Sequence, residues 1–185
     1  MAQVSRQKQR EKVIDVLNKA RARELHAIIQ YMNQHYNLDN MDYGDMAAKV
    51  KLIAIDEMRH AEMFADRIKE LDGEPTSEPA AKTEKGQKVE VVFLFDANLE
   101  DATMAAYNEF LLVCRENGDA ATAKLFEAII DEEQIHFNYF DNTNDHIKNL
   151  NGTYLAQIAG TPSATGLATQ GFVARQGGGG TPAGA

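Results

Sequence analysis

Cysteine and long hydrophobic runs are nearly absent from the 185-residue sequence. Cys114 is the only cysteine, which excludes an internal disulfide and a cysteine-based metal site. No apolar run approaches the roughly 18 residues that a membrane-spanning helix needs. The first ten residues are polar and basic with no apolar stretch behind them, which argues against a signal peptide. Together these absences favour a cytoplasmic protein that does not span a membrane.

Basic residues are outnumbered by acidic ones, 19 Lys and Arg against 28 Asp and Glu. The formal net charge of −9 argues against nucleic acid as a general partner and suits a protein that attracts cations. Hydrophobic residues make up 44% of the chain, enough to bury a core of ordinary size. The length predicts one domain, or one domain with a tail.

One arrangement of chemistry-bearing residues occurs twice. Glu24 is followed by Glu57-Met58-Arg59-His60, and Glu100 is followed by Glu133-Gln134-Ile135-His136, with the second glutamate 33 positions after the first in both halves. Glu and His three residues apart lie on the same face of a helix, one turn above the other. Four carboxylates and two imidazoles are the ligand set of a carboxylate-bridged pair of redox metals in a ferritin-like four-helix bundle.

Four long segments carry apolar residues in alternating steps of three and four, which predicts core-facing helices. All six candidate ligands fall on these apolar stripes, which run over Val13–Tyr31, Met46–Leu71, Phe93–Cys114 and Phe126–Ile147. Six ionisable groups pointing into one core would be severely costly without a compensating charge, and bound cations are the simplest compensation. Carboxylate and imidazole without thiolate suit iron or manganese better than structural zinc.

The pseudo-symmetry of the repeat predicts how the ligands are shared. Two metals about 3.5–4 Å apart need bridging ligands, and Glu57 and Glu133 are predicted to bridge. Glu24 with His60 would complete one metal position, and Glu100 with His136 the other. Tyr31 and Tyr107 each follow a ligand glutamate by seven residues. A core hydroxyl that forms a hydrogen bond is expected for Tyr107, and a redox or gating role stays open for Tyr31.

The breaks between the segments predict the topology. Turns at Asn37–Asp42 and Gly118-Asp119 join two helical hairpins, and the polar stretch Gly73–Lys88, broken by two prolines, connects them. Sixteen extended residues reach about 50 Å, enough to run the length of the bundle and leave the second and third helices parallel. A short fifth helix is expected at Tyr154–Ile158. We predict a bundle with this helix over residues 1–159 and a flexible Gly/Thr/Ala-rich tail over 160–185.

Met58 lies next to a predicted ligand and so points about 100° away from the metal face. Its neighbours on that second face include small apolar residues, Ala54, Ala61 and Ala65. This pattern favours a subunit interface filled by a flexible methionine. A thioether ligand to a haem held between two subunits is the alternative.

Over roughly residues 10–160 the chain resembles a bacterioferritin. The resemblance is carried by Leu17-Asn18-Lys19, Glu24-Leu25, Gln30-Tyr31, Ile55–Ala61 and Asp131–His136. It implies an all-α ferritin-like bundle, a homo-oligomer of 24 subunits built from dimers, and a haem between each pair of Met58 side chains. One haem or related porphyrin per two subunits would then accompany the di-iron centre. The stretch Lys51–Ala54 offers no histidine, which departs from the pattern of many members.

The function that the resemblance implies is iron storage and detoxification. A ferroxidase would oxidise Fe²⁺ with O₂ or H₂O₂ and deposit it as mineral, and haem would pass electrons from a reductase or small electron-transfer protein. The alternative is a soluble di-iron oxidase or peroxidase of the rubrerythrin kind, although that family usually adds a Cys-x-x-Cys iron module. A dimanganese catalase, a DNA-protecting mini-ferritin and a purely structural bundle fit the sequence less well.

Overall fold

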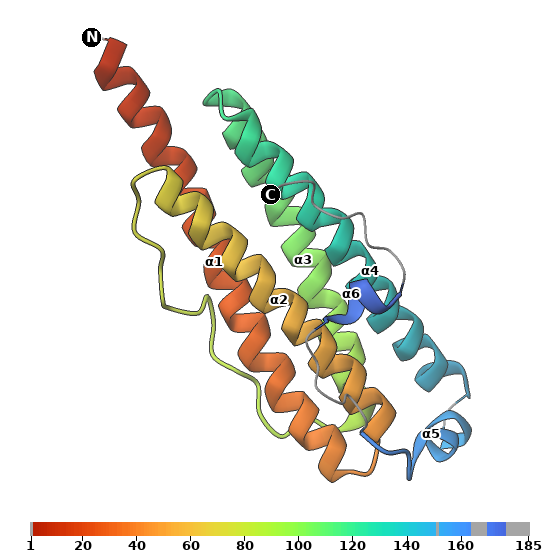
Figure 1. Cartoon of the computed structure of the whole chain (residues 1–185). Coiled ribbons are helices and arrows are strands. Elements are labelled where there is room, and N and C mark those ends of the chain that lie inside the picture. The colour runs from red at the N-terminus through yellow and green to blue at the C-terminus, as the bar shows by residue number, and fades with distance from the viewer. Residues whose placement is uncertain (1, 151, 164–169, 177–185) are drawn as a thin grey trace.

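The computed structural model describes residues 2–150, 152–163 and 170–176. Four long helices form an elongated bundle: α1 (Ala2–Asn40), α2 (Gly44–Glu70), α3 (Val89–Glu116) and α4 (Ala120–Leu150). Helices α1 and α2 form one antiparallel hairpin, and α3 and α4 form the other (Figure 1). Two short helices follow, α5 (Gly152–Ile158) and α6 (Phe172–Arg175). The predicted all-α four-helix bundle with a short fifth helix is confirmed.

The second hairpin turn forms at Gly118-Asp119 as predicted, but α1 continues to Asn40, so the first turn is shorter than the predicted Asn37–Asp42. Asp42 adopts a positive φ of 68° after α1, and Gly118 a φ of 75° after α3. Glycine reaches this region without steric cost, and aspartate reaches it more readily than most residues. Asp119 then caps α4, because its Oδ1 accepts the backbone N–H of Thr122 at 2.9 Å. Helix α1 begins well before the predicted stripe, in a stretch of Gln, Arg and Lys, which are good helix formers.

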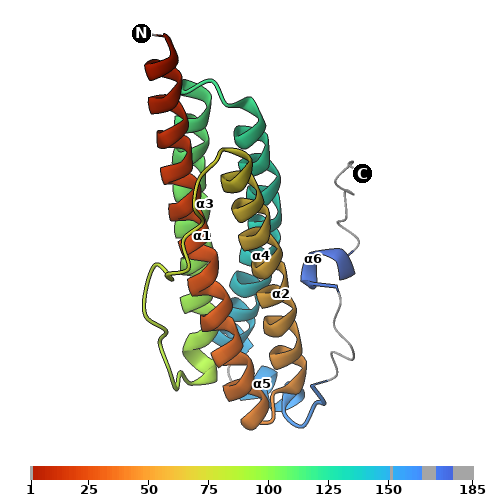
Figure 2. The same ribbon diagram turned by 60° about the vertical axis from the view of Figure 1, so that its left-hand side comes forward.

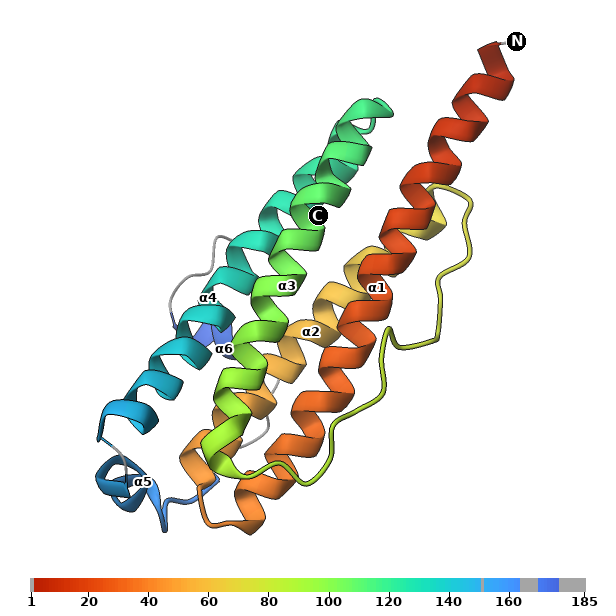
Figure 3. The same ribbon diagram turned by 180° about the vertical axis from the view of Figure 1, so that it is seen from behind.

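The connection between the hairpins runs the length of the bundle along α1, as Figures 2 and 3 show. Side chains of α1 hold it in place: Asn18 accepts the N–H of Thr76, Arg21 donates to the Thr76 carbonyl, and Gln30 pairs with both backbone groups of Glu84. Helices α2 and α3 are consequently parallel. This arrangement relates the two hairpins by an approximate twofold axis perpendicular to the long axis of the bundle.

The apolar core is divided into two clusters. One is built around Phe64, Tyr107 and Phe126, and the other around Tyr31, Phe93 and Phe140. The six predicted ligands come from helix positions between these clusters and are buried with them. A polar layer therefore crosses the middle of an otherwise apolar bundle.

The segment after α4 returns to the bundle at two places. Thr161 forms an isolated bridge with Tyr43, and Gly160 donates its N–H to the Asp42 carbonyl. Helix α6 packs on α2 and α4 near the middle of the bundle, with Phe172 and Val173 buried (Figures 1 and 2). Residues 170–176 of the predicted flexible tail are thus held by the bundle, and the glycine run 177–180 lies outside the described residues. In the part of the chain that is described, no helix has both the length and the apolarity to cross a membrane.

Candidate metal centre

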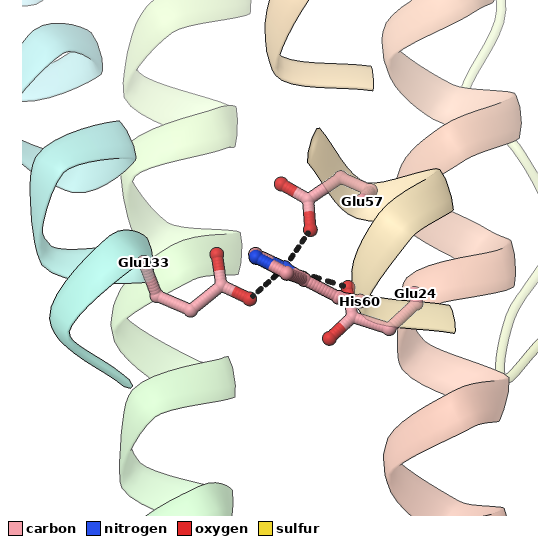
Figure 4. A group of neighbouring side chains, drawn as sticks. All are labelled: Glu24, Glu57, His60 and Glu133. Carbon is pink, nitrogen blue, oxygen red and sulfur yellow. Dashed lines mark hydrogen bonds and ion pairs between the residues drawn. The ribbon is translucent and has the colours of Figure 1, made fainter. Parts of the chain in front are cut away.

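The six predicted ligands meet in one layer at the centre of the bundle. Helix α1 contributes Glu24, and α3 contributes Glu100. Helices α2 and α4 each contribute a Glu–His pair one turn apart. Every one of the six side chains is at most 2% exposed. Figure 4 shows the half of the layer formed by Glu24, Glu57, His60 and Glu133, with the carboxylates turned toward the imidazole.

Two overlapping groups of ligand atoms are present. The first contains Glu24, Glu57, His60 and Glu133, and the second contains Glu57, Glu100, Glu133 and His136. Within each group the oxygen and nitrogen atoms lie within 4.8 Å of one another, the spacing that a single cation can span. Glu57 and Glu133 belong to both groups. Glu24 and Glu100 belong to one group each, as the predicted sharing of ligands requires.

The two shared glutamates divide their oxygens between the histidines. Glu57 places Oε2 3.2 Å from Nδ1 of His60 and Oε1 3.0 Å from Nδ1 of His136. Glu133 places Oε1 3.3 Å from Nδ1 of His60 and Oε2 2.9 Å from Nδ1 of His136. The two rings are 6.0 Å apart between centroids. Each glutamate thus offers one oxygen to each half of the layer, which is the geometry of a bridging carboxylate.

The buried carboxylate oxygens that lack a hydrogen bond are consistent with a pair of bound cations. Nδ1 of each histidine hydrogen-bonds to Oε2 of the glutamate on its own helix, which leaves Glu57 Oε1 and Glu133 Oε1 buried without a hydrogen bond of their own. A buried carboxylate oxygen without a partner is costly, and a cation between the oxygens and the imidazoles would satisfy it. Four carboxylates and two neutral imidazoles are also a donor set suited to iron. The residues present therefore fit a di-iron centre.

The electrostatics of the protein without metal reflect this crowding. Burial and the neighbouring carboxylates raise the pKa of Glu24 and of Glu100 well above the ordinary value. Burial opposes charge on the imidazoles, but the surrounding carboxylates raise the pKa of both His60 and His136. Glu57 is buried too, yet the two imidazoles hold its pKa below the usual range. Protons thus take the place of metal charge, and metal binding must displace them.

The second nitrogen of each histidine has an acidic partner that the sequence analysis did not identify. Nε2 of His60 lies 3.2 Å from Glu132 Oε2, and Nε2 of His136 lies 3.4 Å from Asp56 Oδ2. An N–H on Nε2 can donate to these carboxylates and leave the Nδ1 lone pair directed at the metal layer. The sequence does contain a local feature that marks these partners: each one immediately precedes a shared glutamate, Asp56 before Glu57 and Glu132 before Glu133. Each partner faces the histidine of the opposite hairpin.

The two tyrosines hold the two unshared glutamates across the bundle. The hydroxyl of Tyr31 donates to Glu100 Oε1 at 2.5 Å, and the hydroxyl of Tyr107 donates to Glu24 Oε1. Both rings are fully buried. Tyr107 also lies 3.4 Å from the Ala20 carbonyl, but each hydroxyl donates to one unshared glutamate, so the geometry does not single out Tyr31 for a separate role.

Met58 lies outside the layer. Its side chain is 51% exposed, whereas the adjacent Glu57 is 1% exposed. It therefore points away from the metal face, as predicted. Of the other histidines on α1, His35 contacts the Ala47 carbonyl at 2.9 Å through Nδ1, and His26 is buried. Neither belongs to the candidate metal groups.

Known proteins share this sequence and fold. Residues 14–150 match the ferritin-like domain of the Ferritin family. The chain is 64% identical over 169 residues to a bacterioferritin of Desulfovibrio desulfuricans, covering 91% of this chain and 94% of the relative. It is 33% identical over 151 residues to a bacterioferritin of Mycolicibacterium paratuberculosis, covering 81% and 95%.

Solved structures agree with the sequence relatives. The X-ray structure of the Desulfovibrio desulfuricans bacterioferritin, described with its diiron site in different catalytic states, superposes with a TM-score of 0.87 at 64% identity. That match covers 91% of this chain and 98% of the solved chain. The bacterioferritin BfrA of Mycobacterium tuberculosis superposes with a TM-score of 0.75 at 32% identity, covering 80% of this chain and 93% of the solved chain.

Proposed function

The chain belongs to the ferritin-like family and, within it, to the bacterioferritins, and we propose that its six-residue layer is the ferroxidase centre. The protein stores iron and oxidises Fe²⁺ at a di-iron centre. We assign Glu24 and His60 to one metal position, Glu100 and His136 to the other, and Glu57 and Glu133 to both. The observation that carries this assignment is the division of oxygens by Glu57 and Glu133, one to each histidine.

The chain's own residues position the substrate ions and handle protons. Glu57 and Glu133 would hold both Fe²⁺ through their two oxygens, and each histidine would complete one position through Nδ1. Oxidation of two Fe²⁺ supplies two electrons at once, which with two protons reduces H₂O₂ to two waters or O₂ to H₂O₂. Paired ions thereby avoid release of one-electron oxygen radicals. The hydroxyls of Tyr31 and Tyr107 fix the unshared glutamates, so each ion meets a defined set of ligands.

Removal of the shared carboxylates tests the assignment. A Glu57→Ala, Glu133→Ala double variant should lose rapid Fe²⁺ oxidation, because both ions lose their bridging ligands. The absorbance of the ferric product after mixing with Fe²⁺ in air measures the rate. The exposed pair Gln134→Ala, Asn138→Ala on α4 is the control for helix integrity. An oxidation rate equal to that of the parent in the double variant would refute the ligand set.

We further propose that Met58 is a haem ligand, with one Met58 from each of two subunits. The support is its exposure beside the buried Glu57 and the exposure of Ile29, 49%, on the neighbouring helix of the same hairpin. Two such surfaces brought together would bury these apolar side chains against a porphyrin. The haem would carry electrons toward stored ferric iron from a reductase or small electron-transfer protein.

Replacement of the thioether tests this second assignment. Met58→Leu keeps the side chain apolar and of similar volume, so we expect the subunits to assemble without bound haem. The visible absorption spectrum of the purified protein measures porphyrin content. Met63→Leu, a partly buried methionine on the same helix, is the matched control and should keep its haem. Full porphyrin content in Met58→Leu would rule out the ligand role.

A further inference from the structure

Asp56 is engaged by three elements of the fold. Its carboxylate is fully buried, and Oδ1 accepts a hydrogen bond from Arg59 at 3.0 Å. Oδ2 lies 3.4 Å from Nε2 of His136 and accepts the backbone N–H of Val173 at 2.9 Å. The C-terminal segment thus contacts the carboxylate that holds a candidate metal ligand. A segment 117 residues away in the sequence completes this part of the site.

The segment Gly171–Val173 is closely fitted to this position. A Cβ at Gly171 would overlap the Asp56 carboxylate, so only glycine allows the backbone to pass there. Phe172 is buried, with its ring 4.9 Å from that of Tyr139 and 6.5 Å from that of His136. Burial of Phe172 and Val173 supplies the apolar contribution that holds this short segment on α2 and α4.

The other half of the site is less covered. Glu132 is the counterpart of Asp56 under the approximate twofold axis, and it faces Nε2 of His60 at 3.2 Å. Its side chain is 28% exposed, whereas that of Asp56 is 0% exposed. Two halves that use equivalent ligands therefore differ in how far water reaches the carboxylate behind the histidine. The difference coincides with the position of the C-terminal segment.

We propose that Gly171–Val173 is a cover that makes the two metal positions inequivalent, so that the ion held by His136 exchanges more slowly than the ion held by His60. The cover acts through Asp56: it fixes the carboxylate, which fixes the His136 ring, and it excludes water behind that ring. Residues 171–173 are positioning residues because none of them belongs to the two candidate ligand groups. This inference rests on the proposed ligand set.

Zinc release from the assembled, full-length protein tests the cover without iron oxidation. Zn²⁺ is loaded into metal-free protein, and a chromogenic chelator then reports its release in a stopped-flow experiment. The parent should bind two Zn²⁺ per subunit and release them in a fast and a slow phase of equal amplitude. In Gly171→Ala the slow phase should accelerate about tenfold, the lower end of the effect of losing a carboxylate partner of a ligating histidine.

Two further variants keep the result interpretable. Gly152→Ala adds the same methyl group where it meets no neighbour, and it should release zinc as the parent does. A chain ended after Gln170 removes the cover without inserting an atom at Asp56, and it should reproduce the faster slow phase. Hydrogen exchange of the Val173 amide is an independent readout, slow in the parent and fast in Gly171→Ala.

The outcomes separate the cover from the ligand set. Two bound Zn²⁺ released in a single phase by the parent would overturn the cover while leaving the ligands intact. A slow phase unchanged in both Gly171→Ala and the shortened chain would also overturn it. A parent that binds fewer than two Zn²⁺ per subunit would overturn the proposed ligand set and the cover with it.

Discussion

At the scale of single residues, the histidines of the site are oriented by two carboxylates that are not among the candidate metal ligands. Asp56 and Glu132 each stand behind one histidine and face its Nε2. The hydrogen bond from His60 is the largest cause of the lowered pKa of Glu132, while Asp56, despite its burial, is held ionised by His136 and the Val173 N–H. These negative partners select the ring tautomer and raise the basicity of the ligand nitrogen.

Loss of Glu132 should therefore weaken one metal position and spare the fold. We expect Glu132→Ala to lower Zn²⁺ affinity at the His60 position about 10–100-fold, because the ring loses its fixed orientation. Calorimetric titration of the metal-free protein measures the two affinities. Gln134→Ala, exposed on the same helix, should bind zinc like the parent. Two unchanged affinities in Glu132→Ala would show that the carboxylate does not support the ligand.

The ligand layer could be predicted from the sequence because it is written locally and twice. The Glu and His of each Glu-x-x-His pair lie one helix turn apart, so their relative position follows from the helix itself. The equal spacing in both halves then identifies the two unshared glutamates, Glu24 and Glu100. Asp56 and Glu132 could not be selected in the same way, since they lie off the apolar stripes. The contact of Gly171 with Asp56 depends on tertiary folding alone, and two apolar residues, Phe172 and Val173, are too few to give a periodic signal.

At the scale of elements, Asp119 couples the start of α4 to the end of α2. Its oxygens accept from the Thr122 N–H at 2.9 Å and from Nη2 of Arg67 at 3.0 Å, and Arg67 also donates to the Thr122 hydroxyl. Burial opposes ionisation of Asp119, but the bonds from Thr122 and Arg67 lower its pKa below the ordinary 3.8. The turn between the two helices of one hairpin is thereby tied to the other hairpin.

This coupling gives a pH-dependent prediction. Asp119→Ala should cost about 1 kcal/mol near neutral pH through the lost cap, which corresponds to a melting temperature about 2–4 °C lower for a domain of this size. A depressed folded pKa contributes stability that is present above 3.8 and is lost as pH falls through the folded pKa. The difference between parent and variant should therefore shrink in acid.

Thermal unfolding of the parent and Asp119→Ala at pH 7, 5 and 3 measures the effect. Asp101→Ala on α3 removes an exposed carboxylate that caps no helix, and it should leave the melting temperature nearly unchanged at each pH. A difference that grows toward pH 3 would contradict the depressed pKa of Asp119.

The elements themselves follow from apolar periodicity and turn residues, and so could be predicted with their topology. For the crossover between α2 and α3, the sequence predicts only that it is long enough to span the bundle, and not the path it takes. Its attachment to α1 depends on polar side chains, Asn18, Arg21 and Gln30, that meet backbone groups far away in the sequence. Such contacts have no local pattern. The division of domains at residue 159 stays a prediction, although residues 170–176 do contact the bundle.

At the scale of the whole molecule, several large apolar side chains are exposed. Ile29, Tyr36 and Met58 on the α1–α2 hairpin are 49–62% exposed, and Val91, Leu94 and Leu112 on α3 are 47–55% exposed. Exposed apolar side chains on both hairpins suit a subunit that packs against neighbours. The burial of the ligand layer within one bundle means that assembly is not needed to complete the metal site.

The resemblance to bacterioferritins implies a shell of 24 subunits, so we expect the purified protein to have a mass of about 490 kDa, 24 times the 20.5 kDa of one chain. Size-exclusion chromatography with light scattering and visible detection measures mass and porphyrin together. Tyr36→Asp places a charge on an exposed apolar position and should shift the population toward smaller species, because burying an unpaired charge in an interface is costly. Those smaller species should still bind two Zn²⁺ per subunit, since the ligands belong to one chain. A parent that elutes as a dimer of about 41 kDa would refute the shell and favour a soluble di-iron oxidase, in which the same metal layer acts without a storage cavity.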